Sequence, residues 1–176
     1  RRQRQMCIRD SNYTTSQLAR YITTVANKGN LFKLSLIDKV TTIDGEMVKD
    51  YTPEQENTLT DISSSTWTAI HNGMKKVISS AHPDMFAKLM ASDVSLAGKT
   101  GTAQQSTTHP DHGLFVGFAP SESPEIAFAI RIANGYSSNY AAEVGRYVME
   151  YYYGVTPTEE ILTGHAAKIT TSGGGD

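Results

Sequence analysis

The sequence predicts an α+β fold in which helices flank an antiparallel sheet, and three observations carry this prediction. Helical periodicity appears in three separate segments, near residues 14–28, 63–78 and 139–153. Apolar runs typical of strands gather in one stretch, residues 95–133. A short turn, Pro120 to Pro124, joins the last two runs, so that pair is expected to be antiparallel.

The first helix is expected to start at Thr14. Thr14 and Gln17 have the spacing of a capping box, in which each side chain satisfies an otherwise unpaired amide of the first turn. The apolar residues that follow recur on one helical face: Leu18, Ile22, Val25 and Ala26. Gly29 is expected to end this helix.

A hairpin is predicted next. Leu34–Val40 is rich in apolar residues and is expected to form the first strand. Asp44-Gly45 is a strong turn signal, and Glu46–Val48 can form the returning strand. The polar segment Tyr51–Asp61 contains Pro53 and is predicted to be a loop.

A serine cluster at residues 63–65 can cap the second helix. Its apolar face is expected to consist of Trp67, Ile70, Met74, Val77 and Ile78. Residues 79–92 contain Pro83 and are expected to be irregular.

Three strands are predicted after these helices, at Ser95–Gln104, Leu114–Ala119 and Ile126–Ala133. The last helix is expected at Asn139–Tyr153. Its inward residues are predicted to be Ala141, Val144, Val148 and Tyr152. Residues 155–176 are rich in threonine and glycine and are expected to be a disordered tail.

Composition and charge exclude several classes of function. The net charge of −2 gives no basic footprint for nucleic acid, and Arg1, Arg2 and Arg4 are interpreted as a frayed terminus. A single cysteine, Cys7, cannot form an internal disulfide and has no nucleophile context. No apolar run approaches the roughly 20 residues of a membrane span.

The most informative segment is Ala97-Gly-Lys-Thr-Gly-Thr-Ala-Gln104, and two chemistries compete for it. The ending Gly-Lys-Thr matches a phosphate-binding loop. That motif needs a glycine five residues before Gly98, where this chain has Asp93. No amphipathic helix follows the segment either, which disfavours a phosphate site.

The alternative is the Lys-Thr-Gly element of serine penicillin-recognising enzymes, on a strand that borders the active site. Lys99 would supply positive charge near an anionic peptide terminus, and the Thr100 and Thr102 hydroxyls could grip a carboxylate. Gly101 would let a substrate backbone lie against the strand. The amide of Thr102 would then be available as an oxyanion donor.

Four landmarks in order make the chain resemble class B penicillin-binding proteins, the monofunctional peptidoglycan transpeptidases. The landmarks are Thr14-Thr-Ser-Gln-Leu-Ala-Arg-Tyr21 with Ala26-Asn-Lys-Gly29, then Ile70-His-Asn-Gly-Met74, then Ala97–Gln104, then Phe115-Val-Gly-Phe-Ala-Pro120. The resemblance covers residues 10–154, read as the C-terminal part of a transpeptidase domain, with 1–9 as an irregular N-terminal segment.

The resemblance implies the serine β-lactamase/transpeptidase-like fold and D,D-transpeptidase activity on D-Ala-D-Ala stem peptides. It assigns Lys99, Thr100, Gly101 and Thr102 to substrate binding, with the Thr102 amide in the oxyanion hole. No metal or other cofactor is implied. The implied partners are peptidoglycan stem peptides, β-lactam antibiotics and division or elongation proteins. The implied location is the extracytoplasmic face of the bacterial cytoplasmic membrane, through an N-terminal anchor outside this sequence.

Two motifs of the family are absent from the chain. No serine has lysine three residues later, so the nucleophile motif Ser-x-x-Lys is missing. The one Ser-x-Asn match, Ser137-Ser-Asn139, follows Lys99 instead of preceding it and is interpreted as a helix cap. We therefore expect an incomplete domain that is inactive alone.

Other candidates receive no role. His109 and His112 are expected to be surface loop residues rather than metal ligands. Two rival functions remain open: a non-catalytic β-lactam sensor of the same fold, which an upstream zinc-protease region would favour, and a serine β-lactamase, which fast nitrocefin hydrolysis would favour.

Overall fold

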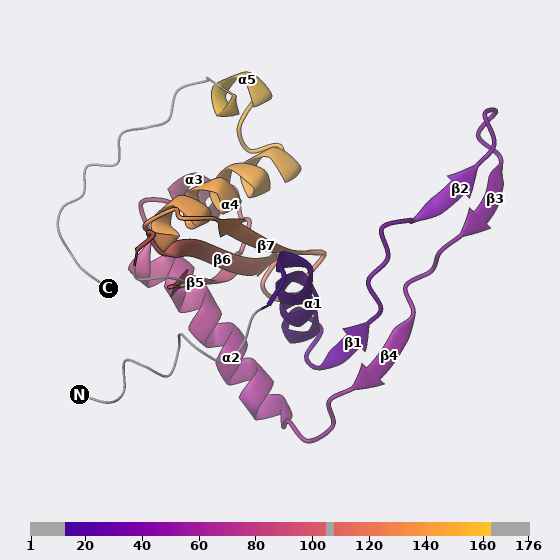
Figure 1. The fold of residues 1–176 in the computed structure, drawn as a ribbon, viewed down its shortest axis with the longest axis horizontal. Helices are drawn as coiled ribbons and strands as arrows, with labels where there is room; N and C mark the ends of the chain where they lie inside the picture. Colours follow the sequence, from indigo (N-terminus) through magenta and orange to yellow (C-terminus); the bar gives the residue numbers. More distant parts are fainter. Residues whose placement is uncertain (1–12, 105–107, 163–176) are drawn as a thin grey trace.

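A three-stranded antiparallel sheet with helices on both faces forms the body of the protein, which confirms the predicted α+β class (Figure 1). The computed structural model describes residues 13–104 and 108–162. The strand order is β5 (Ala97–Ala103), β6 (His112–Ala119), β7 (Ile126–Ile132). Both neighbouring pairs are antiparallel, which confirms the prediction made for β6 and β7 from the short turn at Pro120–Pro124.

The two faces of the sheet pack against different helices. Phe115 and Ala119 of β6 lie in one buried cluster with α4 (Ser138–Tyr152). Phe118 lies in a second cluster with α1 (Thr15–Ala26) and α2 (Ser64–Lys76). Because side chains alternate along a strand, odd-numbered residues of β6 face α4 and even-numbered ones face α1 and α2.

Helices α1 and α2 begin at the predicted caps. Thr14 and Gln17 form both bonds of the capping box, and the Ser63 hydroxyl accepts from the Thr66 amide. The chain leaves α1 through Asn27, and Lys28 and Gly29 adopt positive φ angles of 52° and 99°.

The predicted inward face of α2 is partly wrong. Ile70 is 36% exposed, and the buried residues are Trp67, His71 and Met74. His71 is buried because its Nε2 lies 2.8 Å from the carbonyl oxygen of Val25 and its ring packs on Phe118 at 4.8 Å. A polar residue thus takes the inward position, with a backbone partner that the pattern did not reveal.

The predicted inward face of α4 is also partly wrong, although Ala141 is buried as predicted. Val144, Val148 and Tyr152 are exposed, whereas the small residues Ala141, Ala142 and Gly145 face the sheet with Met149. Ser137 caps this helix by accepting from the Asn139 amide, which confirms the interpretation of Ser137-Ser-Asn139 as a cap.

A long two-stranded arm projects from the body between α1 and α2 (Figure 1). At its base β1 (Asn30–Phe32) pairs with β4 (Gln55–Thr58), and near its tip β2 (Lys39–Thr41) pairs with β3 (Met47–Asp50). The predicted hairpin is confirmed, although its first strand starts at Lys39 rather than Leu34. The loop predicted at Tyr51–Asp61 is wrong over Gln55–Thr58.

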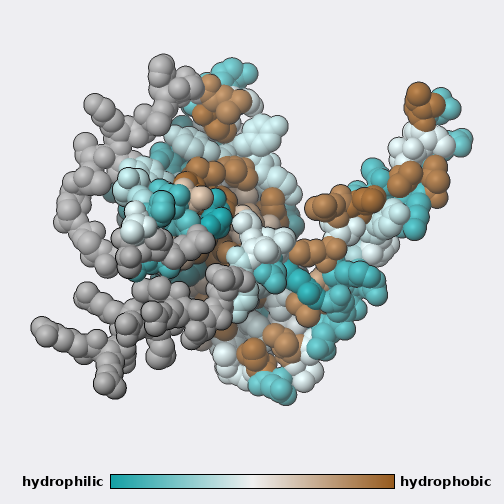
Figure 2. All heavy atoms as spheres, viewed as in Figure 1, coloured by the Kyte–Doolittle hydropathy of each residue, from teal (hydrophilic) through white to brown (hydrophobic). Residues whose placement is uncertain are grey.

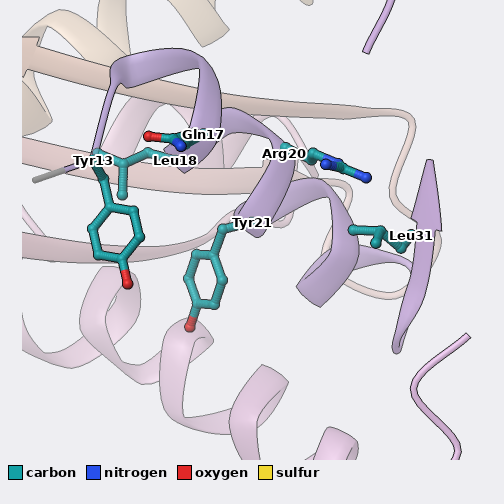
Figure 3. A pocket seen from close by; sticks show the side chains of 6 residues that line it. All are labelled: Tyr13, Gln17, Leu18, Arg20, Tyr21 and Leu31. Carbon is teal, nitrogen blue, oxygen red and sulfur yellow. The ribbon is translucent and has the colours of Figure 1, made fainter. Parts of the chain in front are cut away.

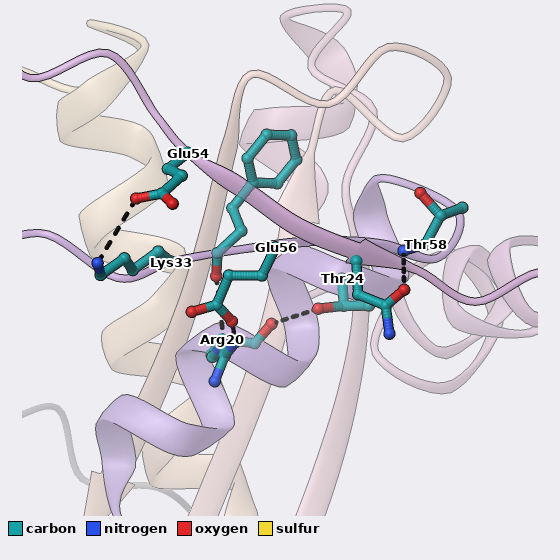
Figure 4. Close-up of polar contacts among 8 residues, drawn as sticks. Arg20, Thr24, Lys33, Glu54, Glu56 and Thr58 are labelled. Carbon is teal, nitrogen blue, oxygen red and sulfur yellow. Dashed lines mark hydrogen bonds and ion pairs between the residues drawn. The ribbon is translucent and has the colours of Figure 1, made fainter.

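The base of the arm is held to α1 by polar contacts (Figure 4). Arg20 pairs with Glu56 through its guanidinium and donates from Nε to the Phe32 carbonyl at 3.2 Å. Lys33 lies 3.5 Å from Glu54 across the two strands.

Beyond this base, large apolar side chains of the arm are exposed, and they appear as brown patches in Figure 2: Leu34, Leu36, Ile37, Val40, Ile43, Met47 and Val48.

Three helical segments extend into regions predicted to be irregular or disordered. A π-helical segment, Val77–Ala81, continues α2, and α3 (Ala87–Ala91) follows within the region expected to be irregular. One helical turn, α5 (Thr158–Ile161), lies within the segment expected to be a disordered tail. Residues 1–9, which include Cys7, and the rest of that segment from 163 lie outside the described residues.

Within the described ranges, no helix combines the length and apolar character needed to cross a membrane. No group of three His, Cys, Asp or Glu residues in those ranges is arranged to hold a metal ion.

Candidate functional site

The predicted site segment forms β5, which lies at one edge of the sheet. Its first residues, Ala97 and Gly98, are buried, and exposure increases at Lys99 and again at Thr102. Among the described strands, none pairs with its outer edge, because β5 stands first in the order β5-β6-β7. A strand edge of this kind offers backbone donors and acceptors to an extended ligand.

The direction of each peptide group in β5 follows from two contacts. The Ala97 carbonyl points toward β6, since its oxygen lies 2.7 Å from the position that a Cβ would take at Gly117. The Thr100 carbonyl accepts from Lys99 Nζ at 2.7 Å. Successive residues of a strand present their N–H and C=O groups to opposite sides. The peptide groups of Thr100 and Thr102 therefore point to the open edge.

The side chains of the segment divide between the two faces of the sheet. Ala97 packs in the cluster with α1 and α2, whereas a Cβ at Gly98 would meet Phe115 in the cluster with α4. By alternation Lys99 and Gly101 face one side, and Thr100 and Thr102 face the other. The two hydroxyls share a face, as expected, and the Lys99 ammonium reaches the edge itself through its bond to the Thr100 carbonyl.

The start of β5 is anchored by one carboxylate. Glu122, in the turn after β6, accepts from Lys75 of α2 and from the hydroxyls of Ser95 and Ser121, both at 2.6 Å. The hydrogen bond from Lys75, followed by those from Ser121 and Ser95, lowers the pKa of Glu122 to about 2. The carboxylate therefore stays ionised and ties the end of α2 to the residues before β5.

The end of β5 lies beside a tight junction of loops. His112 opens β6 opposite Ala103 and is buried, because its Nδ1 accepts from the Asn134 amide at 2.9 Å. The prediction that His112 is a surface loop residue is therefore wrong, whereas His109 is exposed. Gly113, opposite Thr102, packs so closely that an added Cβ would lie 2.4 Å from the Ser137 carbonyl oxygen.

Two hollows lie away from β5. One, of about 430 Å³, runs along the outer side of α1, where Tyr13 and Tyr21 point the same way (Figure 3). Its lining is Tyr13, Gln17, Leu18, Arg20, Tyr21 and Leu31. The other, of about 460 Å³, lies between Asp84–Lys88 and α4. Neither hollow is lined by any residue from Lys99 to Thr102, so neither is the predicted site.

Sequence reasoning missed the residues that support the strand from within. Phe115 is fully buried and stands directly opposite Thr100, and Gly98 lies against its ring. The sequence presents Phe115 as one apolar residue in an apolar run, with no signal of its special position.

The fold and site define the class: an α+β domain whose edge strand carries Lys-Thr-Gly. The chain matches the family described as penicillin binding protein transpeptidase domain over residues 7–150. It therefore belongs to the family of penicillin-binding transpeptidase domains.

Individual relatives agree with this assignment. The chain is 42% identical over 71 residues, 32% of its length and 11% of the relative, to the peptidoglycan D,D-transpeptidase MrdA of Acinetobacter baumannii. It is 29% identical over 160 residues to penicillin-binding protein 2A of Bacillus subtilis, covering 80% of this chain and 22% of that protein. The chain thus spans about a fifth of the length of the Bacillus protein.

A solved structure shows the same fold. The imipenem acyl-enzyme complex of penicillin-binding protein A from M. tuberculosis superposes with a TM-score of 0.70 and 26% identity. The match covers 82% of this chain and 32% of that one. The expected serine β-lactamase/transpeptidase-like fold class is confirmed.

Proposed function

We propose that this chain supplies the substrate-binding strand of a peptidoglycan D,D-transpeptidase, with β5 as the strand against which a D-Ala-D-Ala stem peptide lies. The observation that carries the proposal is the open edge of β5, where the Lys99 ammonium bonds the Thr100 carbonyl and the Thr102 peptide group points outward. Membership in the transpeptidase family supports it. The domain part would comprise residues 10–154.

Each residue of the segment has a role that its position suits. The Lys99 ammonium would attract the terminal carboxylate of the peptide, and the hydroxyls of Thr100 and Thr102 would donate hydrogen bonds to it. Gly101 would leave room for the peptide backbone, because it has no side chain. The Thr102 amide, directed to the open edge, would donate to the developing oxyanion of the attacked carbonyl.

The complete reaction needs groups that this sequence does not contain. A serine would attack the D-Ala-D-Ala carbonyl, form an acyl-enzyme and release the terminal D-alanine, and an amine of a neighbouring stem would then take the acyl group. No Ser-x-x-Lys motif is present among the 176 residues. Action at the extracytoplasmic face of the membrane and contact with division or elongation proteins belong to the same proposal.

The binding prediction is tested by titrating the chain with diacetyl-L-lysyl-D-alanyl-D-alanine and following the amide resonances of residues 98–103. Lys99→Ala should weaken binding by about tenfold or more, because a charge-assisted contact to the carboxylate is lost. Lys39→Ala, on an exposed strand of the arm, is the matched control and should leave affinity unchanged. Amidating the peptide's C-terminus should reproduce the loss; equal affinity for Lys99→Ala and wild type would contradict the assignment.

The absence of the nucleophile gives a second expected result. Incubated with benzylpenicillin, the chain should show no stoichiometric covalent mass increase, because none of its serines has the lysine partner that activates the attack. Intact-protein mass spectrometry measures this directly, with an active penicillin-binding protein as the positive control. A one-to-one acyl adduct would show that another residue serves as nucleophile.

A further inference from the structure

The ring of Phe115 fills a slot between the site strand and helix α4. Phe115 is fully buried at the centre of β6, and its register partner in β5 is Thr100. On one side of the ring lies Gly98, where a Cβ would come within 2.7 Å of Cε2 and Cζ. On the other side lies Gly145 of α4, where a Cβ would come within 2.6 Å of Cδ1.

Both glycines are needed at this spacing. Contacts shorter than 3.0 Å cannot be accommodated without displacement, so any side chain at Gly98 or Gly145 must move the ring or the backbone. Neither glycine has a positive φ angle, so backbone conformation does not explain them. The close approach of the Phe115 ring explains why both positions hold glycine.

Neighbouring side chains also restrict movement of the Phe115 ring in other directions. Phe86 stacks on it at a centroid distance of 5.9 Å, and Phe128 packs against it at 5.5 Å. Ile78 closes the slot near Gly98, where its Cδ1 lies 3.1 Å from the position of the added Cβ. Interiors packed to this density transmit a displacement instead of absorbing it.

We propose that Phe115, held between Gly98 and Gly145, is a positioning residue that sets the place of Lys99–Thr102 relative to α4. A displacement of α4 or an added atom at Gly145 is passed through the ring to β5. The affinity of β5 for a ligand then depends on the contact between the Phe115 ring and Gly145, which lies on the side of the ring away from β5. The consequence for ligand binding rests on the proposed function, whereas the mechanical coupling does not.

The coupling is tested on the ¹⁵N-labelled chain through the amide resonances of residues 98–102. Gly145→Ala should displace these resonances, because the added methyl drives the ring toward β5. Gly73→Ala is the matched control, since nothing lies within 4 Å of its added Cβ, and it should leave them in place. Phe115→Leu combined with Gly145→Ala should return them toward the wild-type positions, because the smaller side chain leaves space for the methyl.

The double variant also protects the test against a failure to fold. If Gly145→Ala alone is not folded, Phe115→Leu is compared with the double variant, whose added methyl should partly refill the space and bring the resonances closer to wild type. Displacements in Gly145→Ala no larger than those in Gly73→Ala, or strictly additive displacements in the double variant, would overturn the proposal.

Peptide titration separates this inference from the proposed function. Gly145→Ala should bind diacetyl-L-lysyl-D-alanyl-D-alanine roughly tenfold more weakly, as expected for a small misplacement of a binding strand, and the double variant should recover affinity. Coupled resonances in a chain that binds no peptide would support the positioning role and overturn the proposed function. Normal peptide binding by Gly145→Ala would overturn the positioning role and leave the proposed function intact.

Discussion

Replacing Arg146 by methionine is expected to lower the free energy of unfolding by about 3–5 kcal/mol, because it strips a buried carboxylate of its cation. The Glu150 side chain is 1% exposed and accepts from Arg146 Nη1 at 2.8 Å. Its other oxygen accepts from the Thr156 hydroxyl at 2.7 Å. Burial, the largest single influence, lowers the pKa of Arg146, but its hydrogen bonds and charge interactions with Glu150 and Tyr147 together leave that pKa raised, so the cation is permanent.

Chemical denaturation of three variants measures this effect. The double variant Arg146→Met with Glu150→Leu should recover much of the loss, since apolar residues can replace a buried ion pair. Lys88→Met breaks the exposed pair with Glu160, whose atoms are 3.5 Å apart, and should change stability by less than about 1 kcal/mol. A loss for Arg146→Met as small as that of Lys88→Met would show that Glu150 finds other partners.

The body of the fold could be predicted from the sequence because its signals are local. The caps at Thr14 and Ser63 depend on residues three apart, and the strands of the sheet follow from apolar patterning. In β7, Ile126, Phe128, Ile130 and Ile132 alternate with Ala127, Ala129 and Arg131, and this alternation matches the observed face toward α4.

The errors occur where packing partners distant in sequence decide the outcome. In α4, hydrophobicity favoured Val144 and Val148 as inward residues, but the ring of Phe115 leaves space only for Gly145. In β4, Gln55–Thr58 has no strand pattern and is held by pairing with β1 and by the contact of Arg20 with Glu56. Such strands are stabilised by backbone pairing, for which side-chain patterns carry no signal.

The site segment could be predicted from its sequence motif, whereas its geometry is determined by the fold. Lys-Thr-Gly could be located from sequence, and so could the shared face of Thr100 and Thr102. The open edge and the outward Thr102 peptide group depend on strand order and register, which a single sequence does not determine. The binding and catalytic roles of Lys99–Thr102 stay predictions.

Replacing Phe118 by alanine is expected to cost about 3–5 kcal/mol of unfolding free energy, through lost burial and the cavity left behind. Phe118 is fully buried, stands opposite Ala97 of β5 and Ala127 of β7, and packs on the His71 ring. Its cluster contains residues of both α1 and α2, and Val116 of the same strand packs against that cluster.

The loss should be uneven across the molecule, which distinguishes it from general destabilisation. Hydrogen exchange should accelerate most in α1 and α2, and less in α4, whose contacts lie on the other face through Phe115. Tyr151→Ala, at a residue that is 63% exposed, is the control and should stay within about 0.5 kcal/mol of wild type. Equal acceleration in all three helices would mean that the two faces of the sheet unfold as one unit, so that the site strand could not remain ordered on its α4 side alone.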